Sequence, residues 1–166
     1  MDAVAFAVGQ WRAEAPTLDH APTLIFGRLA RYAQMLAVMN DRVLAELGLA
    51  AWELDVLDTL TRQGAPYSLT AGDLERAMLI TSGTTTHRIG RLEARGYVTR
   101  SRDADDRRVV NVVLTDAGRA ACVTALEALL ERQRRALDAL ETHEQDALTT
   151  GLRALGRVLR DAPPDA

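Results

Sequence analysis

The stretch Met78–Leu114, MLITSGTTTHRIGRLEARGYVTRSRDADDRRVVNVVL, carries the clearest structural pattern in this chain. Its first part predicts a helix that begins at Thr81 or Ser82, because both side chains are favourable N-caps. Residues at helical spacing then form one face of that helix, made by Thr85, Ile89 and Leu92. The basic and polar residues fall elsewhere, which is typical of an amphipathic helix with a charged outer side.

The second part of this stretch predicts a two-stranded β ribbon. Gly96 ends the helix, since glycine readily adopts the left-handed conformation that follows a last helical turn. Two β-rich runs follow at 97–102 and 108–114, separated by the charged turn DADD. Such runs around a turn are typical of a β hairpin. This hairpin would carry arginines at its tip.

A further short helix is predicted just before this stretch, over residues 70–77, TAGDLERA. Two short helices with a tight connection form a helix-turn-helix, whose second helix usually enters the DNA major groove. The ribbon would then be a wing. Residues 82–108 contain seven arginines and four acidic residues, a local net charge of +3 in a chain of net charge −3. Positive charge is therefore concentrated where DNA phosphates would lie.

Three motifs in this region, in this order and spacing, resemble the winged helix-turn-helix of the MarR family of bacterial transcriptional regulators. They are RLEARGYV at 91–98, DADDRR at 103–108 and VVLTDAGR at 112–119. The resemblance runs from about Leu24 to the C-terminal helix. It implies a mainly α fold with a small two-stranded β wing, in which N- and C-terminal helices form a dimer.

We expect one domain over residues 1–166, because a chain of this length with 48% hydrophobic residues can form a single core. Hydrophobic spacing predicts further helices. These cover the first dozen residues, 24–47, 50–62, a segment from 115 or 116 onwards, and 142–161. Regions 1–47 and 115–161 would form the helical dimerisation region, and 50–114 the DNA-binding lobe.

The C-terminal helices offer more apolar surface than one small domain needs. A seven-residue repeat runs through Val123, Leu126, Leu130, Gln133, Leu137 and Leu140. A second row follows at Leu148, Leu152, Leu155 and Leu159. Such rows favour a homodimer, and a two-fold protein would match a palindromic DNA site. Alternatively, the two rows pack on each other within one monomer.

The candidate DNA-binding residues lie on the second helix and on the wing. For phosphate and base-edge contacts in the major groove they are Ser82, Thr84, Thr85, Thr86, His87 and Arg91. On the wing they are Arg102 and Arg107, and the resemblance favours Arg107 for insertion into the minor groove. The alternative is a solvated charged face, the commonest role of surface arginines.

A narrower resemblance concerns the N-terminal segment GQWRAEAPTLDHAP followed by GRLAR, which is similar to the urate-responsive branch of the same family. That branch implies a ligand site at Trp11, Asp55, Arg88 and Arg100. The chemistry suits such a site, because two arginines can bind an anion, tryptophan forms a flat wall and aspartate accepts a ligand N–H. Alternatively, each residue is structural: a core tryptophan, a surface acid and two DNA-facing charges.

Other functional classes find little support in the sequence. The single cysteine, Cys122, excludes an internal disulfide and favours a packed thiol over a peroxide sensor. The three histidines show no metal-ligand spacing, and no cofactor fingerprint is present. We therefore expect no cofactor, no metal and no enzyme. The N-terminus lacks an export signal and no apolar run is long enough to span a membrane, which indicates a cytoplasmic protein.

These patterns together predict a ligand-responsive, DNA-binding transcriptional regulator. We expect a homodimeric repressor that binds a palindromic operator and is released by a small anionic or phenolic metabolite. The alternative is a winged-helix protein-interaction module, or a regulator without effector control. The sequence leaves open the effector, the operator, the choice between repression and activation, and which residues read bases.

Overall fold

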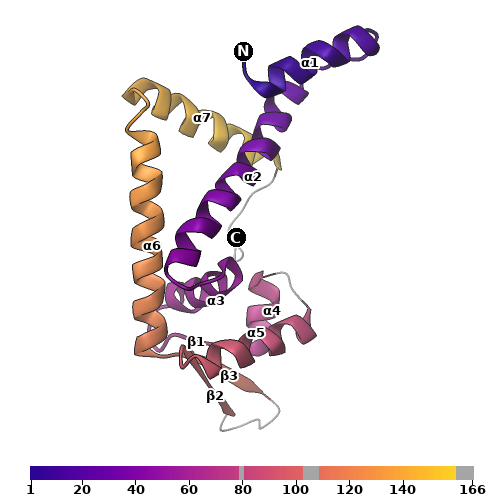
Figure 1. Ribbon diagram of the computed structural model, residues 1–166. Coiled ribbons are helices and arrows are strands. Elements are labelled where there is room, and N and C mark those ends of the chain that lie inside the picture. Colours follow the sequence, from indigo (N-terminus) through magenta and orange to yellow (C-terminus); the bar gives the residue numbers. More distant parts are fainter. Residues whose placement is uncertain (79–80, 103–108, 160–166) are drawn as a thin grey trace. The chain divides into compact units, whose positions relative to one another are not determined.

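The computed structural model describes residues 1–78, 81–102 and 109–159 (Figure 1). These residues divide into two compact units, one that ends at Ala125 and one that begins at Leu126. Along the described chain the elements are α1 (Ala3–Glu14), α2 (Thr23–Glu46), α3 (Ala51–Arg62), β1 (Ser68–Thr70), α4 (Ala71–Met78), α5 (Ser82–Ala94), β2 (Val98–Arg102), β3 (Val110–Leu114), α6 (Asp116–Leu137) and α7 (Thr142–Leu159). The predicted mainly α fold is confirmed. None of the helices in the described residues is long and apolar enough to cross a membrane.

The N-terminal helix α1 packs on α2. The Asp2 carboxylate caps α1 by accepting the backbone N–H of Ala5 at 2.9 Å, and it also binds the guanidinium of Arg28 on α2 at 2.7 Å. Val4 and Val8 of α1 are buried, and a Cβ at Gly27 of α2 would lie 3.1 Å from Val4. The small residue therefore lets the two helices approach closely, and the cap of one is tied to the other.

The sheet contains one strand more than the predicted ribbon. Its order is β1-β3-β2 with antiparallel pairing, so β3 lies in the centre. β2 and β3 form the expected hairpin, with Val98 opposite Leu114. The added strand β1 pairs Ser68 with Val113. Three residues are too few to show a period-two pattern, and the partner lies far along the chain, so local sequence gave no signal for β1.

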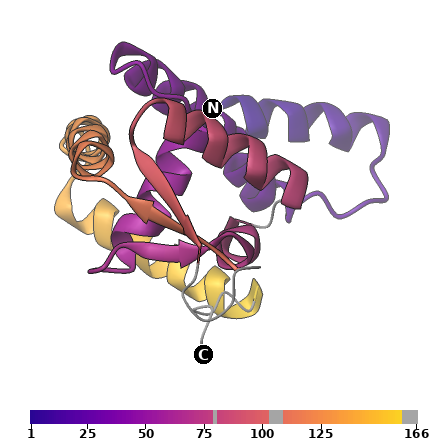
Figure 2. The same cartoon turned by 90° about the horizontal axis from the view of Figure 1, so that it is seen from below.

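The core of the first unit lies between α3, α4, α5 and the sheet. Its most buried side chains come from each of these elements and from the first part of α6: Leu57 and Leu60, Leu74, Leu92, Val98, Val112 and Cys122. α5 leads directly into β2, so the helix and the hairpin lie at the same surface of this unit (Figure 2). Apolar burial thus fixes the inner face of α5 and leaves its outer face open.

The second unit consists of the last part of α6 and α7. The Gln145 side chain joins them by donating to the backbone oxygens of Leu137, at 3.1 Å, and Leu140, at 3.2 Å. Several leucines of the predicted rows are exposed in this chain: Leu130, Leu137, Leu148, Leu152 and Leu159. None of the residues of α7 is buried. The apolar rows are therefore available to a partner.

The junction between the hairpin and α6 depends on a very close backbone contact. The Thr115 hydroxyl donates to the backbone oxygens of Gly96, at 2.7 Å, or Tyr97, at 3.0 Å, and accepts the N–H of Gly118. A Cβ at Gly118 would lie only 2.1 Å from the Tyr97 oxygen. Glycine is required there because the first turn of α6 rests on the chain that follows α5.

We predict that Gly118→Ala destabilises the protein by about 1–3 kcal/mol, the usual cost of forcing an extra carbon into a packed site. Urea unfolding followed by circular dichroism measures this change. Gly9→Ala is the matched control, because nothing lies within 4 Å of a Cβ at that helical position. It should leave stability unchanged or raise it slightly. Equal midpoints for Gly118→Ala and the parent protein would contradict the close contact.

Candidate DNA-binding surface and adjoining charged pocket

One face of α5 is turned inward, and it includes a predicted DNA-binding residue. Thr85, Ile89 and Leu92 are all buried. Thr85 is only 2% exposed, and its hydroxyl donates to the backbone oxygen of Thr81 at 3.1 Å. Because this hydroxyl bonds within its own helix and faces the core, Thr85 does not lie on the predicted DNA surface.

The other candidates on α5 lie at the surface. All five are exposed: Ser82, Thr84, Thr86, His87 and Arg91. The N-cap Thr81 makes no side-chain bond to the first-turn N–H groups; its hydroxyl lies 3.0 Å from that of Thr84. An exposed helix N-terminus with hydroxyl groups nearby suits contact with a phosphate, since the first N–H groups and the helix dipole favour anions.

Only one of the two wing candidates, Arg102, lies among the described residues. Arg102 is the last residue of β2, and it is exposed. Arg107 and the DADD turn lie outside the described residues. The hairpin therefore places one of the two predicted arginines at the end of a strand that begins at the base of α5.

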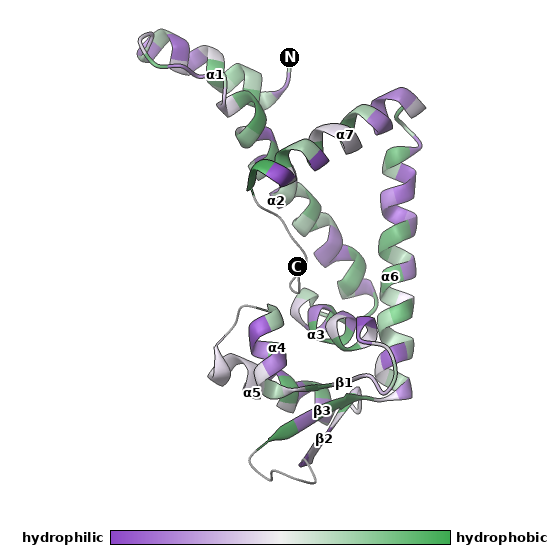
Figure 3. Ribbon diagram, turned by 180° about the vertical axis from the view of Figure 1, so that it is seen from behind, coloured by the Kyte–Doolittle hydropathy of each residue, from purple (hydrophilic) through white to green (hydrophobic). Residues whose placement is uncertain are grey.

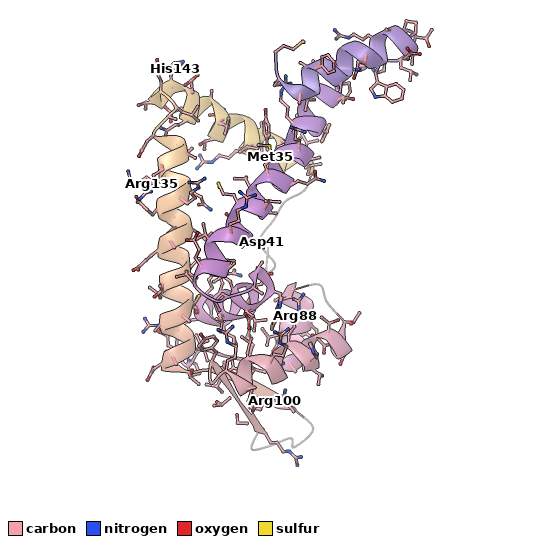
Figure 4. All side chains as sticks on the ribbon, viewed as in Figure 1. Met35, Asp41, Arg88, Arg100, Arg135 and His143 are labelled. Atoms are coloured by element: carbon pink, nitrogen blue, oxygen red, sulfur yellow. The ribbon has the colours of Figure 1, made fainter. Side chains whose placement is uncertain are left out.

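A pocket of about 370 Å³ lies between α3, α4 and α5. Its lining residues are Asp55, Asp58, Thr59, Arg62, Ala77, Met78 and Arg88. The structure thus brings together two of the four predicted ligand residues, Asp55 and Arg88. Figure 4 shows Arg88 on the side of α5 that faces α3 and α4. Both signs of charge line the pocket, so it is suited to a polar ligand.

The charge state of Asp55 is perturbed by its surroundings. Burial raises the pKa of this carboxyl, Arg88 lowers it by attraction, and Asp58 raises it by repulsion. The neighbouring Asp58 is itself paired, since its carboxylate accepts from Arg62 Nε at 2.8 Å. A carboxyl that lines a pocket and whose pKa is raised by its surroundings is typical of a functional site.

Arg100 lies on the opposite flank of α5 from Arg88 (Figure 4). Its Nη2 donates to the backbone oxygen of Thr86 at 3.4 Å, and its Nε lies 3.3 Å from the Glu93 carboxylate. Gly90 makes room, because a Cβ there would lie 3.1 Å from Arg100 Nη2. Arg100 therefore ties β2 to α5, and it is not among the residues that line the pocket.

Trp11 is likewise absent from the pocket lining. It lies on α1, which packs on α2, and it is 59% exposed. The structure therefore assembles half of the predicted ligand set and leaves Trp11 and Arg100 at two other places. Within one chain, α1 therefore does not supply the predicted tryptophan wall to the pocket.

Sequence reasoning missed the residues by which α3 contacts α5. Arg88 and Arg91 lie over the ring of Trp52, with Cζ 5.5 and 5.2 Å from its centroid. The residue after Trp52 is Glu53, whose two carboxylate oxygens accept hydrogen bonds from Arg95 Nη1 at 2.9 Å and 2.8 Å. The arginines follow each other at steps of three and four, which places them on one flank of the helix. That spacing was a visible signal for a row of contacts.

Cys122 is fully buried on α6, and burial raises the pKa of its thiol. A thiol that stays protonated is a poor nucleophile. This agrees with the predicted packed role. In the part of the chain that the structure describes, no group of three or more histidine, cysteine or acidic residues is placed to hold a metal ion.

The chain is similar to known transcriptional regulators. A model described as the MarR family matches residues 47–109, which span α3 to the wing. The HTH-type transcriptional regulator PecS of Dickeya dadantii is 40% identical over 152 residues, which cover 91% of this chain and 89% of PecS. These relatives are transcriptional regulators rather than enzymes, as predicted.

Solved structures agree with this assignment. Bordetella bronchiseptica BpsR, whose DNA binding is regulated by 6-hydroxynicotinic acid, is 27% identical with a TM-score of 0.64, over 80% of this chain and 98% of BpsR. The apo form of MarR from E. coli is 24% identical with a TM-score of 0.69, over 78% of this chain and 94% of that one. By the fold, the family match and the extended similarity to PecS, this chain belongs to the MarR family of transcriptional regulators.

Proposed function

We propose that the protein binds a palindromic operator as a homodimer, represses transcription there, and is released by a small anionic or phenolic metabolite. The observation that carries this proposal is the position of α5 between two sites. Its outer face presents His87 and other polar groups to solvent, while Arg88, the next residue, lines a pocket. One helix can therefore respond to a ligand and contact DNA. We expect such a regulator to act in the cytoplasm.

The proposed DNA surface combines the outer face of α5 with the wing. Its contacts would come from Ser82, Thr84, Thr86, His87, Arg91, Arg102 and Arg107. Hydroxyl groups and arginines are the usual donors to phosphates and base edges. The buried face of α5 and its contacts with α3 and β2 hold the α5 members of this set in place, which favours defined docking.

The proposed dimer uses the exposed apolar side chains of the helices outside the DNA-binding lobe. On α2 these are Ile25, Phe26, Tyr32, Met35, Leu36 and Val38, and Figure 3 shows apolar residues along the length of this helix. On α6 and α7 they include the leucines of the predicted rows. So many exposed large apolar residues are unusual for a monomer and mark an interaction surface. A second copy would also present a second α5 to the next major groove.

The proposed effector site is built on Asp55 and Arg88. A volume near 370 Å³ lies in the range of small-molecule sites. Arg88 offers donors to an anionic or phenolic oxygen, and Asp55 can accept a ligand N–H. The effector of BpsR, 6-hydroxynicotinic acid, is a small aromatic acid of this kind. Arg100 would act by holding β2 on α5, and Trp11 would contribute if a second subunit carries α1 to the pocket.

The central experiment is titration of the purified protein onto DNA from upstream of its own gene. Fluorescence anisotropy would follow binding in the absence and presence of urate, tricarboxylates and phenolic acids. Saturable binding of one dimer per palindrome, weakened by one of these compounds, supports the proposal. A protein that binds no DNA, and instead retains a protein partner through its winged helix, would be the interaction module considered above.

We predict that Arg91→Ala weakens operator binding by about 1–3 kcal/mol, because it removes one charged contact to a phosphate or base edge. If the contact is to a phosphate, the dependence of affinity on salt becomes less steep by about one counterion. Arg132→Ala, an exposed arginine on α6, is the matched control and should bind like the parent protein. Equal losses in the two variants, or none in either, would place the DNA surface elsewhere.

The raised pKa of Asp55 predicts a pH-dependent effect on stability. Above the raised pKa the carboxylate is ionised in the folded and unfolded states, and its burial opposes folding. This cost disappears as the pH falls through the raised pKa towards the ordinary value of an aspartate. Asp55→Asn should therefore be more stable than the parent at pH 7, and the difference should shrink on acidification. Urea unfolding across this pH range would show a constant difference if the assignment were wrong.

A further inference from the structure

Trp52, near the start of α3, contacts two arginines that the proposed function assigns to different tasks. Arg88 lines the pocket, and Arg91 is a proposed DNA contact. Both guanidinium groups lie over the same indole ring, at 5.5 and 5.2 Å from its centroid. The indole thus contacts both the residue that faces the pocket and the residue proposed to face DNA.

Sharing one ring makes the positions of the two arginines depend on each other. A guanidinium over an indole face is attracted to its π electrons, which at an exposed site changes an equilibrium by about two- to fivefold. Two guanidinium groups that share a ring also repel each other. Whatever neutralises or withdraws one of them therefore changes how firmly the other is held.

We propose that Trp52 is a positioning residue that couples the pocket to the DNA surface through Arg88 and Arg91. This inference rests on the proposed function and names its regulatory contact. An anion bound to Arg88 neutralises that guanidinium and removes its repulsion of Arg91. Arg91 then stays over the indole and is withheld from DNA. Conversely, a phosphate that draws Arg91 away leaves the indole to Arg88, so ligand and DNA oppose each other.

The direction of the effect follows from the geometry of α5. Arg88, Arg91 and Arg95 lie on the flank that faces α3, while His87 lies outward from it. To reach a phosphate, Arg91 must turn from the indole towards the outer face. The ligand needs to favour only the arrangement in which Arg91 is retained, since a differential affinity is enough to shift the balance.

The test is a double-mutant cycle in operator affinity that needs no effector. Arg88→Ala and Arg91→Ala are measured singly and together, in the parent, in Trp52→Phe and in Trp52→Leu. In the parent and in Trp52→Phe, which keeps an aromatic ring, the effect of Arg91→Ala should change about three- to fivefold when Arg88 is absent. In Trp52→Leu the two effects should be independent. A structural role alone would lower affinity without changing this coupling.

Independent effects of Arg88→Ala and Arg91→Ala in the parent protein, to within twofold, would overturn the inference while operator binding itself upheld the proposed function. This comparison needs no change at Trp52, so it stands even if Trp52→Leu fails to fold. If the parent binds no operator, the proposed function fails instead. Urea unfolding of the Trp52→Leu and Arg88→Ala cycle then decides the contact, and additive effects there would refute it.

Urate and 6-hydroxynicotinate provide a second readout in the same variants. The ratio of operator dissociation constants with and without the probe should fall about two- to fivefold in Trp52→Leu and persist in Trp52→Phe. If a probe releases operator equally well from the parent and from Trp52→Leu, the indole does not transmit the signal. Two tryptophans are present, so a Trp11→Phe background makes Trp52 the sole tryptophan. Its emission should then shift on operator binding, and Arg91→Ala should remove the shift.

Discussion

The carboxylate of Glu53 is the group on which the position of α5, the proposed recognition helix, depends. Its side chain is 4% exposed, and it accepts from the backbone N–H of Ala50 as well as from Arg95. The hydrogen bond that Arg95 donates to Glu53 raises the pKa of Arg95, so this guanidinium stays charged. An unpaired carboxylate at this depth would cost several kcal/mol. The pair therefore fixes the C-terminal end of α5 against the N-terminal end of α3.

The hairpin depends on the same contact. Arg95 also lies over the ring of Tyr97, 4.7 Å from its centroid, and donates to the Tyr97 hydroxyl at 3.2 Å. Val98 then begins β2, and the Tyr97 carbonyl supports the first turn of α6. The end of α5, the start of β2 and the first turn of α6 therefore meet at Arg95 and Tyr97. Towards the other end of α5 the contacts weaken, from an ion pair at Arg95 to shared ring contacts at Arg91 and Arg88. The ion pair therefore lies at the end of α5 that leads into β2, and the ring contacts lie nearer the pocket.

The sequence predicted the fold where local signals were strong. Thr23–Glu46 and Ala51–Arg62 agree with the predicted 24–47 and 50–62 to within one residue, because apolar spacing and Gly48 defined them. The strand Ser68–Thr70 was not predicted, because the strand with which it pairs lies far along the chain. The candidate site was predictable in part. Asp55 and Arg88 were predicted from the family resemblance. Thr85 fitted both the inward face of the helix and the set of polar DNA contacts, and the sequence alone did not decide between these two positions.

The contacts of Trp52 and of Arg100 depend on how helices pack, which spacing along one segment does not reveal. Arg100 was predicted as a ligand residue, with a DNA-facing charge as the alternative, and only the three-dimensional arrangement places it beside Glu93. Trp11 lies on a helix whose inner face is defined by Val4 and Val8, yet the ring remains exposed. The role of Trp11 in a ligand site therefore stays a prediction, and the structure of one chain shows no partner for its ring in the pocket.

The claim that α3 sets the position of the recognition helix is tested most directly by the coupling between Glu53 and Arg95. Glu53→Gln, Arg95→Gln and the double variant would be compared by urea unfolding and by operator affinity. The account predicts that the single losses in stability do not add, with a coupling of at least about 1 kcal/mol, and that each single variant also weakens operator binding. Losses that add to within about 0.5 kcal/mol, with operator affinity unchanged, would contradict it.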